Sequence, residues 1–307
     1  MSGERSVTIA LDSWLGLSPD EQAIARSVRV ASLFDYPQTL AQLRQTLVES
    51  TQTATEVMHT YERSSTLRAT VDYREGFFFP QGRHDLVGER RRREARSRMF
   101  LSRHRRLLRA ICALPYVDMV ALSGSIAHMN LEGGGDLDLF IITRGHHVWS
   151  VTVAVVVLAK LMRRRKTLCV NFVIDNQALQ VAPADLFAAS QIIHLKPIVG
   201  DATYRRFLAA NAFVSSFYLN FHAAPPHPLA VRQRWPLRAA KAASEFLLSW
   251  PSLLVERACR TAYRGYLRRQ ADTWTSPEHV RLEDDCLKLH TRSHRRSVEG
   301  RLGNAGL

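Results

Sequence analysis

Cysteine is scarce in this sequence, and none of the cysteines is spaced for a disulfide framework or a structural zinc site. Cys112, Cys169, Cys259 and Cys286 are widely scattered, and the chain has no Cys-x-x-Cys motif. No cluster of cysteine and histidine occurs at zinc-ligand spacing. The pattern therefore favours reduced thiols in a cytoplasmic protein.

Long apolar runs are absent as well. The most apolar stretch, residues 148–162, is shorter than the ~20 residues that a membrane-spanning helix requires. We therefore predict a buried helix there and no integral membrane segment. The start of the chain has no basic segment followed by a sustained apolar one, so no secretory signal is apparent.

Acidic residues are outnumbered by basic ones. The 307 residues include 42 Lys and Arg against 28 Asp and Glu, which gives a formal net charge of +14 and a sequence pI near 10.3. Such a balance favours a polyanionic partner, such as nucleic acid, nucleotide or acidic membrane lipid, without choosing among them. The length allows two or three domains.

The most informative stretch is residues 117–143. An apolar run ends at Gly124-Ser125, ten residues follow, and Asp136 and Asp138 then open a second apolar run. Because side chains alternate between the faces of a strand, both carboxylates share one face. Two such carboxylates raise each other's pKa unless a cation lies between them, and oxygen ligands favour a hard ion such as Mg²⁺. We therefore predict a metal site at Asp136 and Asp138.

An Asp-x-Asp pair alone also occurs on the solvated face of an ordinary edge strand. The joint pattern of strand, Gly-Ser turn, gap, carboxylate pair and apolar strand is rarer, and it resembles the DNA polymerase β-like nucleotidyltransferase superfamily, especially its minimal members. The resemblance implies that Gly124 and Ser125 hold a nucleoside triphosphate such as ATP. It also implies that Asp136 and Asp138 bind Mg²⁺ or Mn²⁺ for transfer of a nucleoside monophosphate with release of pyrophosphate.

The next predicted strand, residues 168–174, departs from the family pattern. A third carboxylate often lies near the middle of this strand, but here the corresponding residue is Asn171, and Asp175 follows at the strand's end. An amide oxygen can ligate Mg²⁺ but cannot act as a general base. Either Asp175 completes the catalytic set, or two carboxylates suffice, or activity is lost. We also expect Arg144, just after the carboxylate strand, either to contact the triphosphate or to face solvent.

The N-terminal part carries three helix-start signals. Ser18, Thr39 and Thr53 are each followed three residues later by Glu or Gln, as in a capping box. Residues 67–79, with a turn at 74–76, predict a hairpin. Three helices and a hairpin resemble a winged helix-turn-helix over residues 16–82. Its third helix is not strongly basic, so protein docking is slightly favoured over sequence-specific DNA binding.

Residues 83–113 are rich in arginine, with an apolar stripe that predicts one long linker helix. Either the arginines of this helix only face solvent, or they contact the phosphates of a nucleic acid. A short helix is expected over residues 126–131, with its N-terminus toward the phosphates.

Residues 181–307 predict a helical C-terminal region, with a linker at 223–228 and a frayed tail from about 291. Aromatic and basic residues interleave between 229 and 270. Such a pattern suits a membrane surface or nucleic acid, but packing against the catalytic domain is the favoured explanation.

The sequence thus predicts an α/β (α+β) protein in which a small mixed catalytic sheet is flanked by helices. We divide it into a winged-helix-like domain (16–82), a linker helix (83–113), a nucleotidyltransferase core (114–180) and a helical C-terminal region (181–307). The predicted reaction is metal-dependent nucleotidyl transfer to an unidentified small-molecule, RNA or protein acceptor. The alternative is a catalytically degenerate fold that acts as a nucleic-acid-binding or regulatory module.

Overall fold

The structure is a computed structural model that describes residues 16–222, 235–248, 250–274 and 280–289. The linker expected at 223–228 and the tail expected from 291 lie outside these residues. The chain divides into two compact units. One contains the residues up to Arg91 together with residues 215–222, and the other contains Arg92–Val214 and the described parts of residues 223–293.

The first unit combines short helices with a small antiparallel sheet of strand order β1-β3-β2. Its elements are α1 (Pro19–Ser32), β1 (Gln38–Thr39), α2 (Leu40–Gln45), α3 (Ala54–Arg63), α4 (Ser65–Thr70), β2 (Val71–Arg74) and β3 (Phe77–Pro80). The capping boxes at Ser18, Thr39 and Thr53 are all formed, as predicted. Ile24 and Phe78 lie in its apolar core.

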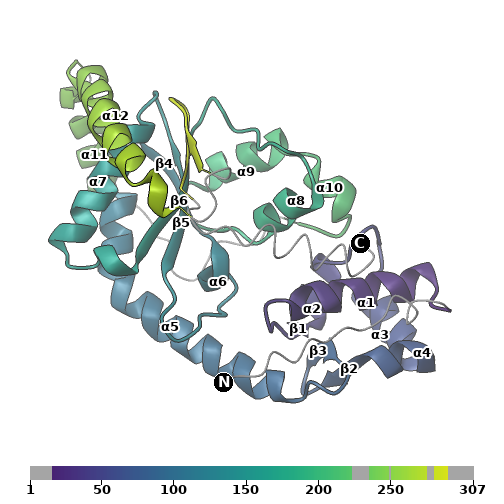
Figure 1. The fold of residues 1–307 in the computed structure, drawn as a ribbon. Coiled ribbons are helices and arrows are strands. Elements are labelled where there is room, and N and C mark those ends of the chain that lie inside the picture. The colour runs from purple at the N-terminus through teal and green to yellow at the C-terminus, as the bar shows by residue number, and fades with distance from the viewer. Residues whose placement is uncertain (1–15, 223–234, 249, 275–279, 290–307) are drawn as a thin grey trace. The chain divides into compact units, whose positions relative to one another are not determined.

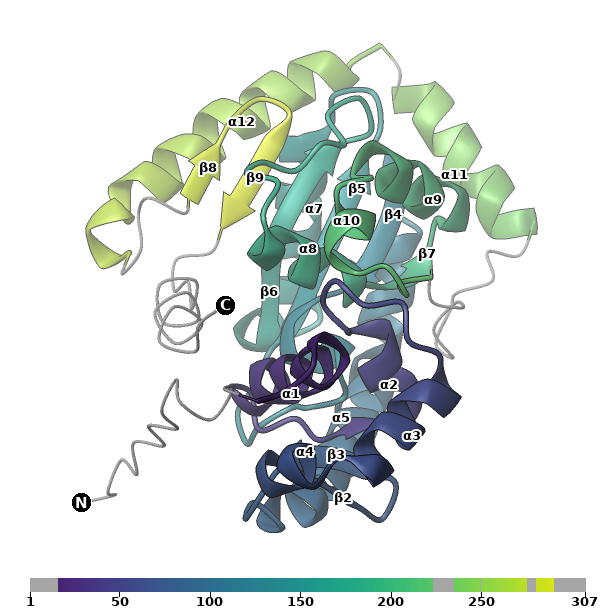
Figure 2. The same cartoon turned by 90° about the vertical axis from the view of Figure 1, so that its right-hand side faces the viewer.

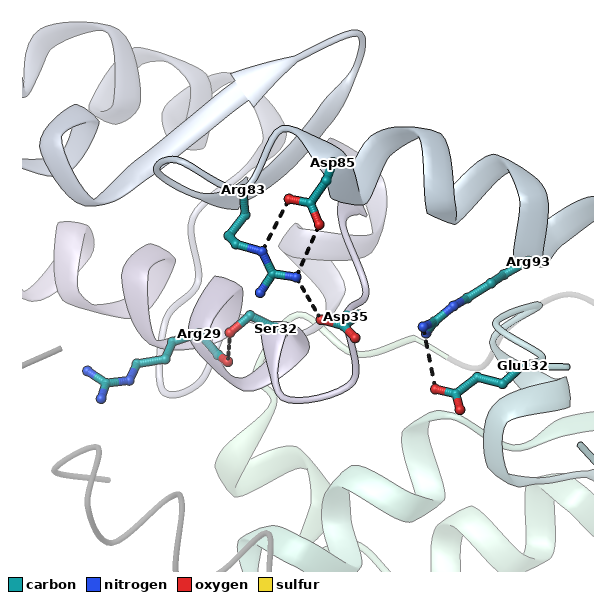
Figure 3. A network of polar contacts seen from close by, with 7 residues as sticks. All are labelled: Arg29, Ser32, Asp35, Arg83, Asp85, Arg93 and Glu132. Atoms are coloured by element: carbon teal, nitrogen blue, oxygen red, sulfur yellow. Dashed lines mark hydrogen bonds and ion pairs between the residues drawn. The ribbon is translucent and has the colours of Figure 1, made fainter. Parts of the chain in front are cut away.

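The prediction of a strand from residue 67 was wrong at its start. Residues 65–70 form α4, because the Ser64 hydroxyl accepts a hydrogen bond from the Leu67 N–H at 3.0 Å and caps a helical turn. After the hairpin, Arg83 bridges Asp35 at 3.1 Å and Asp85 at 3.2 Å (Figure 3). The predicted hairpin is formed by β2 and β3, but four helices precede it among the described residues instead of three, and the winged-helix hypothesis stays a prediction.

Helix α5 (Asp85–Cys112) is the long arginine-rich helix that the sequence predicts. The boundary between the two units falls within it, at Arg91 and Arg92. Its apolar stripe is buried, with Leu101, Leu108 and Ile111 in the core of the second unit. A buried stripe on one face is what anchors an otherwise highly charged helix.

The second unit is a mixed α/β structure built on a sheet of strand order β7-β4-β5-β6-β9-β8 (Figures 1 and 2). Strands β5 and β6 are parallel, and the other neighbouring pairs are antiparallel. Its strands are β4 (Val117–Leu122), β5 (Leu137–Thr143), β6 (Leu168–Asp175), β7 (Lys196–Val199), β8 (Val280–Leu282) and β9 (Cys286–Leu289). The fold class predicted from the sequence is therefore confirmed.

Helices cover both faces of this sheet. Figure 1 shows the sheet between α5, α7 and α12 on one side and α8 and α9 on the other. The helices after α5 are α6 (Gly124–Ala127), α7 (Val148–Leu161), α8 (Leu186–Ile193), α9 (Asp201–Ala210), α10 (Val214–Phe217), α11 (Trp235–Leu248) and α12 (Ser252–Arg269), with 3₁₀ turns at Arg165–Thr167 and Ala271–Thr273. The predicted buried helix is α7, whose Trp149 and Val155 are fully buried. None of the described helices is long and apolar enough to cross a membrane.

The expectation of a purely helical C-terminal region was incomplete, since that region supplies β7, β8 and β9 to the sheet. Runs of three or four residues are too short to show strand periodicity. Pro197, which interrupts the helical pattern of the sequence, lies in β7. This strand is at the edge of the sheet, where a residue without an N–H is tolerated.

Candidate functional site

Asp138 lies at the point where β4 ends and β5 begins. The backbone N–H of Ser123 donates to the Asp138 carbonyl at 3.0 Å, which brings the Gly-Ser turn beside the carboxylate strand. Gly124 has a φ of +62°, and a Cβ at this position would lie 3.0 Å from Asp138 Cγ and overlap its oxygen Oδ2. Glycine is therefore required here both for the left-handed backbone and for the close approach.

Asn171 faces the same carboxylate from β6. Its Nδ2 donates to Asp138 Oδ1 at 2.8 Å, while its Oδ1 accepts from the Cys169 thiol at 2.9 Å. In this arrangement Asn171 therefore orients Asp138 through its amide nitrogen, while its amide oxygen accepts a hydrogen bond from Cys169. Cys169 had no predicted role, and its position two residues before Asn171 on a strand is the signal that places both on one face.

Burial is the main influence on the charge of Asp138. The pKa of this carboxyl is raised to about 6, mainly by burial and also by the negative charge of Asp136, although the hydrogen bond from Asn171 opposes the rise. Asp136 itself is exposed and precedes the strand. The pair therefore combines one half-buried and one exposed carboxylate, and a cation would relieve the cost of the half-buried charge.

Ser123 is a site residue that the sequence interpretation missed. Its Oγ is buried and has no hydrogen-bond partner among the described residues, although it stands directly before Gly124. A buried hydroxyl without a partner is unfavourable unless something else satisfies it. The signal in the sequence was the Ser-Gly-Ser tripeptide, in which only Gly124 and Ser125 were given a role.

The predicted short helix after the Gly-Ser turn is shorter and starts earlier than expected. It is α6, with four residues from Gly124 to Ala127, and the chain then turns back so that the Asn130 N–H donates to the Ser125 carbonyl at 2.9 Å. Met129, with a φ of +56°, ends any helical continuation.

Helix α5 anchors the loop that leads to Asp136. Arg96 donates to the Leu131 carbonyl at 2.9 Å, and the Leu131 N–H donates to Ser97 Oγ at 3.1 Å. Arg93, which is buried, pairs with Glu132 at 3.4 Å (Figure 3). Part of the arginine run therefore has a structural task, whereas the sequence suggested either a solvated face or a phosphate contact.

Asp175 does not belong to this site, and its predicted place there is corrected. In the parallel β5–β6 register Asp138 pairs with Cys169, whereas Asp175 pairs with Thr143. The two ends of β6 are about 20 Å apart at strand rise. Asp175 is fully buried, and its carboxylate accepts hydrogen bonds from the N–H groups of His146 and Gln177 at 2.8 and 3.0 Å.

Arg144 is likewise at the opposite end of β5, so of its two predicted alternatives the contact with a triphosphate at Gly124 is corrected, and the side chain is exposed. It pairs with Glu245 of α11. Together with Asp118 and Lys241 it lines a cavity of about 310 Å³. This cavity is separate from the carboxylate pair because it lies where β5 ends and β4 begins.

The donor set fits a metal that arrives with its substrate better than a metal held by protein alone. The described residues contain no group of three or more His, Cys, Asp or Glu arranged to hold a metal ion. Mg²⁺, however, is commonly bound by one or two carboxylates together with substrate phosphates and water. Asp136 and Asp138 provide two carboxylates, the number that such a site uses.

Fold and site together define a mixed α/β protein in which Asp136 and Asp138, at the start of β5, follow a glycine turn at Gly124 that approaches Asp138 closely. In comparisons with known proteins the chain matches no family model, no curated protein and no solved structure. The proposed membership of the nucleotidyltransferase superfamily therefore depends on the residues and geometry described above.

Proposed function

We propose that this chain is a cytoplasmic, metal-dependent nucleotidyltransferase of the DNA polymerase β-like type. The observation that carries the proposal is the approach of Gly124 to Asp138, which sets a backbone suited to phosphate against a carboxylate suited to Mg²⁺. The sheet itself does not require a carboxylate at position 138, because removal of Asp138 from water disfavours its charged form.

In this proposal Asp136 and Asp138 hold Mg²⁺ or Mn²⁺, and Gly124, Ser125 and the buried hydroxyl of Ser123 bind phosphate oxygens of an NTP such as ATP. When bound, the metal supplies charge neutralisation on the phosphates and activation of the attacking oxygen. Asn171 keeps Asp138 in one orientation, and α5 fixes the loop before Asp136 through Leu131. The protein thus contributes positioning, which is most of what phosphoryl transfer needs.

The reaction forms a bond from an acceptor oxygen to the α-phosphorus and breaks the bond to the β-phosphate, so that pyrophosphate leaves. Asn171 cannot take the acceptor's proton, and Asp175 lies at the other end of the strand. The proton therefore passes to solvent or to a base on the acceptor. The acceptor is a hydroxyl or phosphate of a small molecule, an RNA or a protein.

The test is Mg²⁺-dependent NTP binding, followed by pyrophosphate release with candidate acceptors, for Asp136→Asn/Asp138→Asn beside a matched control. Asp118→Asn serves as the control, because this carboxylate lies at the far end of β4 and accepts from Thr203 at 3.0 Å. We expect the double variant to lose metal-dependent binding and the control to keep it. Equal binding by the double variant and the wild type would contradict the proposal.

A second candidate function is a degenerate fold that binds nucleic acid. The observation in its favour is Asn171, which donates to Asp138 where a third carboxylate is expected. Helix α5 still presents exposed arginines that take no part in the loop contacts, among them Arg103 and Arg106. NTP binding without pyrophosphate release in any acceptor fraction, together with RNA binding that Arg103→Glu/Arg106→Glu abolishes, would favour this candidate.

A further inference from the structure

An exposed apolar surface lies where α11 meets α12. Leu247, Trp250, Leu253 and Leu254, here named the apolar tip, are 77, 91, 55 and 64% exposed. Figure 2 shows the two helices converging at this point, away from the sheet. The expectation that the aromatic and apolar residues of this region pack on the catalytic domain is therefore wrong for Leu247 and Trp250.

The remainder of α12 has two distinct faces. Its inner face packs against α7, with Glu256 and Leu267 buried. The Glu256 carboxylate accepts hydrogen bonds from the N–H groups of Trp149 and Ser150 at 2.8 and 2.7 Å. The outward face carries the exposed residues Leu253, Leu254, Arg257 and Arg268, whereas Arg260 and Arg264 are half-buried and lie between the two faces.

Arginines on and beside this outward face line a hollow. A cavity of about 450 Å³ is bounded by Arg260, Thr261, Arg264, Gly265, Arg268 and Asp284. Asp284 pairs with Arg260, and one Arg264 nitrogen donates to the Leu282 carbonyl. Three arginines and one aspartate line the hollow, so its lining carries a net positive charge suited to phosphate groups.

We propose that the apolar tip and the arginine face of α12 form a docking surface for an anionic phospholipid membrane. The tip enters the boundary between headgroups and acyl chains, where the amphipathic ring of Trp250 is favoured. The arginines of the same face bind lipid phosphates at the surface. The protein is held on one leaflet, in keeping with the finding that none of the described helices can span a membrane.

Charge complementarity selects this occupant over others. A second copy of the chain would bring another arginine row against the first, and like charges oppose such an interface. Nucleic acid would satisfy the arginines but would leave four large apolar side chains in water. An anionic bilayer satisfies both the apolar tip and the arginines at once.

The experiment is flotation of the full-length protein with vesicles of phosphatidylcholine alone and of phosphatidylcholine with about 30% phosphatidylglycerol, each at low and high salt. Trp250→Glu/Leu254→Glu changes the tip. The matched control is Met99→Glu/Leu161→Glu, which replaces two other exposed apolar residues, 57 and 76% exposed, with the same charge change. Quenching of tryptophan fluorescence by brominated anionic lipid is compared between the wild type and Trp250→Phe.

We expect the wild type to float with anionic vesicles and not with neutral ones, the tip variant to partition at least about tenfold more weakly, and the control to stay within about twofold of the wild type. Brominated lipid should quench the wild type more than Trp250→Phe. Equal flotation of tip variant and wild type, equal loss in the control, or absence of flotation would each overturn the proposal. So would a wild-type dimer that the tip variant converts to a monomer while neither binds vesicles.

Discussion

At the scale of single residues, Asp138 determines how the candidate site responds to pH. Its carboxyl is protonated more readily in the folded chain than in an unfolded one, because burial raises its pKa from 3.8 to about 6. Between these two values the folded state holds a proton that the unfolded state has released. The site therefore stores an unfavourable charge at neutral pH, which a bound cation would offset.

The first prediction concerns stability without metal. As pH rises from about 4 to about 6, this group should lower the free energy of unfolding, by on the order of 2 kcal/mol in total. Asp138→Asn, which carries no charge, should remove this part of the pH dependence and be the more stable protein at pH 7. Urea unfolding of both proteins across this range measures the difference, and parallel pH curves would contradict it.

Nucleotide binding should respond to pH in the opposite direction. A metal requires the carboxylate form, so Mg²⁺-dependent NTP affinity should fall about tenfold for each pH unit below about 6 and reach a plateau above it. Titration of a fluorescent NTP with Mg²⁺ between pH 5 and 8, with a binding curve lacking Mg²⁺ as the control, measures this effect. A flat profile across pH 6 would show that Asp138 is not a metal ligand.

The third residue-scale prediction is Gly124→Ala. The added methyl group would overlap the Asp138 carboxylate at a left-handed backbone position, so we expect a loss of about 1–3 kcal/mol in stability and at least a tenfold loss in NTP affinity. Gly133→Ala is the matched control, because nothing lies within 4 Å of a Cβ there. If both variants bind NTP equally well, the close approach has no functional consequence.

At the scale of elements, the N-terminus of α7 depends on a carboxylate from α12. Glu256 is buried and accepts the N–H groups of Trp149 and Ser150, which lie in the first turn of α7. Such hydrogen bonds satisfy donors that a helix cannot pair internally, and the negative charge suits the positive end of the helix dipole. The contact joins Trp149 and Glu256, which are 107 positions apart in the sequence.

We therefore predict that Glu256→Ala lowers the free energy of unfolding by about 2–4 kcal/mol, since two buried N–H groups lose a charged partner. Glu62→Ala, on the exposed face of α3, should change it by less than about 0.5 kcal/mol. Chemical denaturation of the two variants beside the wild type provides the measurement. Equal effects would mean that the α7 cap contributes little.

Local signals of the sequence predicted local structure well, and contacts between distant segments were harder to foresee. The capping boxes at Ser18, Thr39 and Thr53 are formed because each needs only four consecutive residues. The strand starting at residue 280 was not predicted, because three residues contain too little pattern and their pairing partner is another short strand.

The candidate site shows the same division. Gly124, Asp138 and Asn171 come together because adjacent strands bring them to one end of the sheet. Asp175 and Arg144 do not join them. Asp175 is the last residue of β6 and Arg144 directly follows β5, so both lie at the other end of these strands. Strand length made this separation foreseeable for Asp175, whereas the role of Cys169 needed the side-chain contact itself.

At the scale of the whole molecule, a net charge of +14 does not mean a uniformly basic surface. Some arginines are engaged inside the fold, as Arg93 and Arg96 are in the second unit. Others are gathered on particular faces, of which the outward face of α12 adjoins exposed leucine and tryptophan. If position matters more than total charge, two variants of equal net charge should behave differently.

The last prediction makes that comparison on vesicle binding. Arg257→Glu/Arg268→Glu on α12 and Arg105→Glu/Arg109→Glu on α5 each change the net charge by −4, from +14 to +10, and all four arginines are exposed. We expect the α12 variant to partition onto anionic vesicles at least about tenfold more weakly, whereas the α5 variant loses no more than about threefold, because surface attraction falls off within about 10 Å. Equal losses measured by flotation would mean that the protein is attracted by its net charge alone. A loss confined to the α12 variant would require a membrane-facing side, since only placement distinguishes the two proteins.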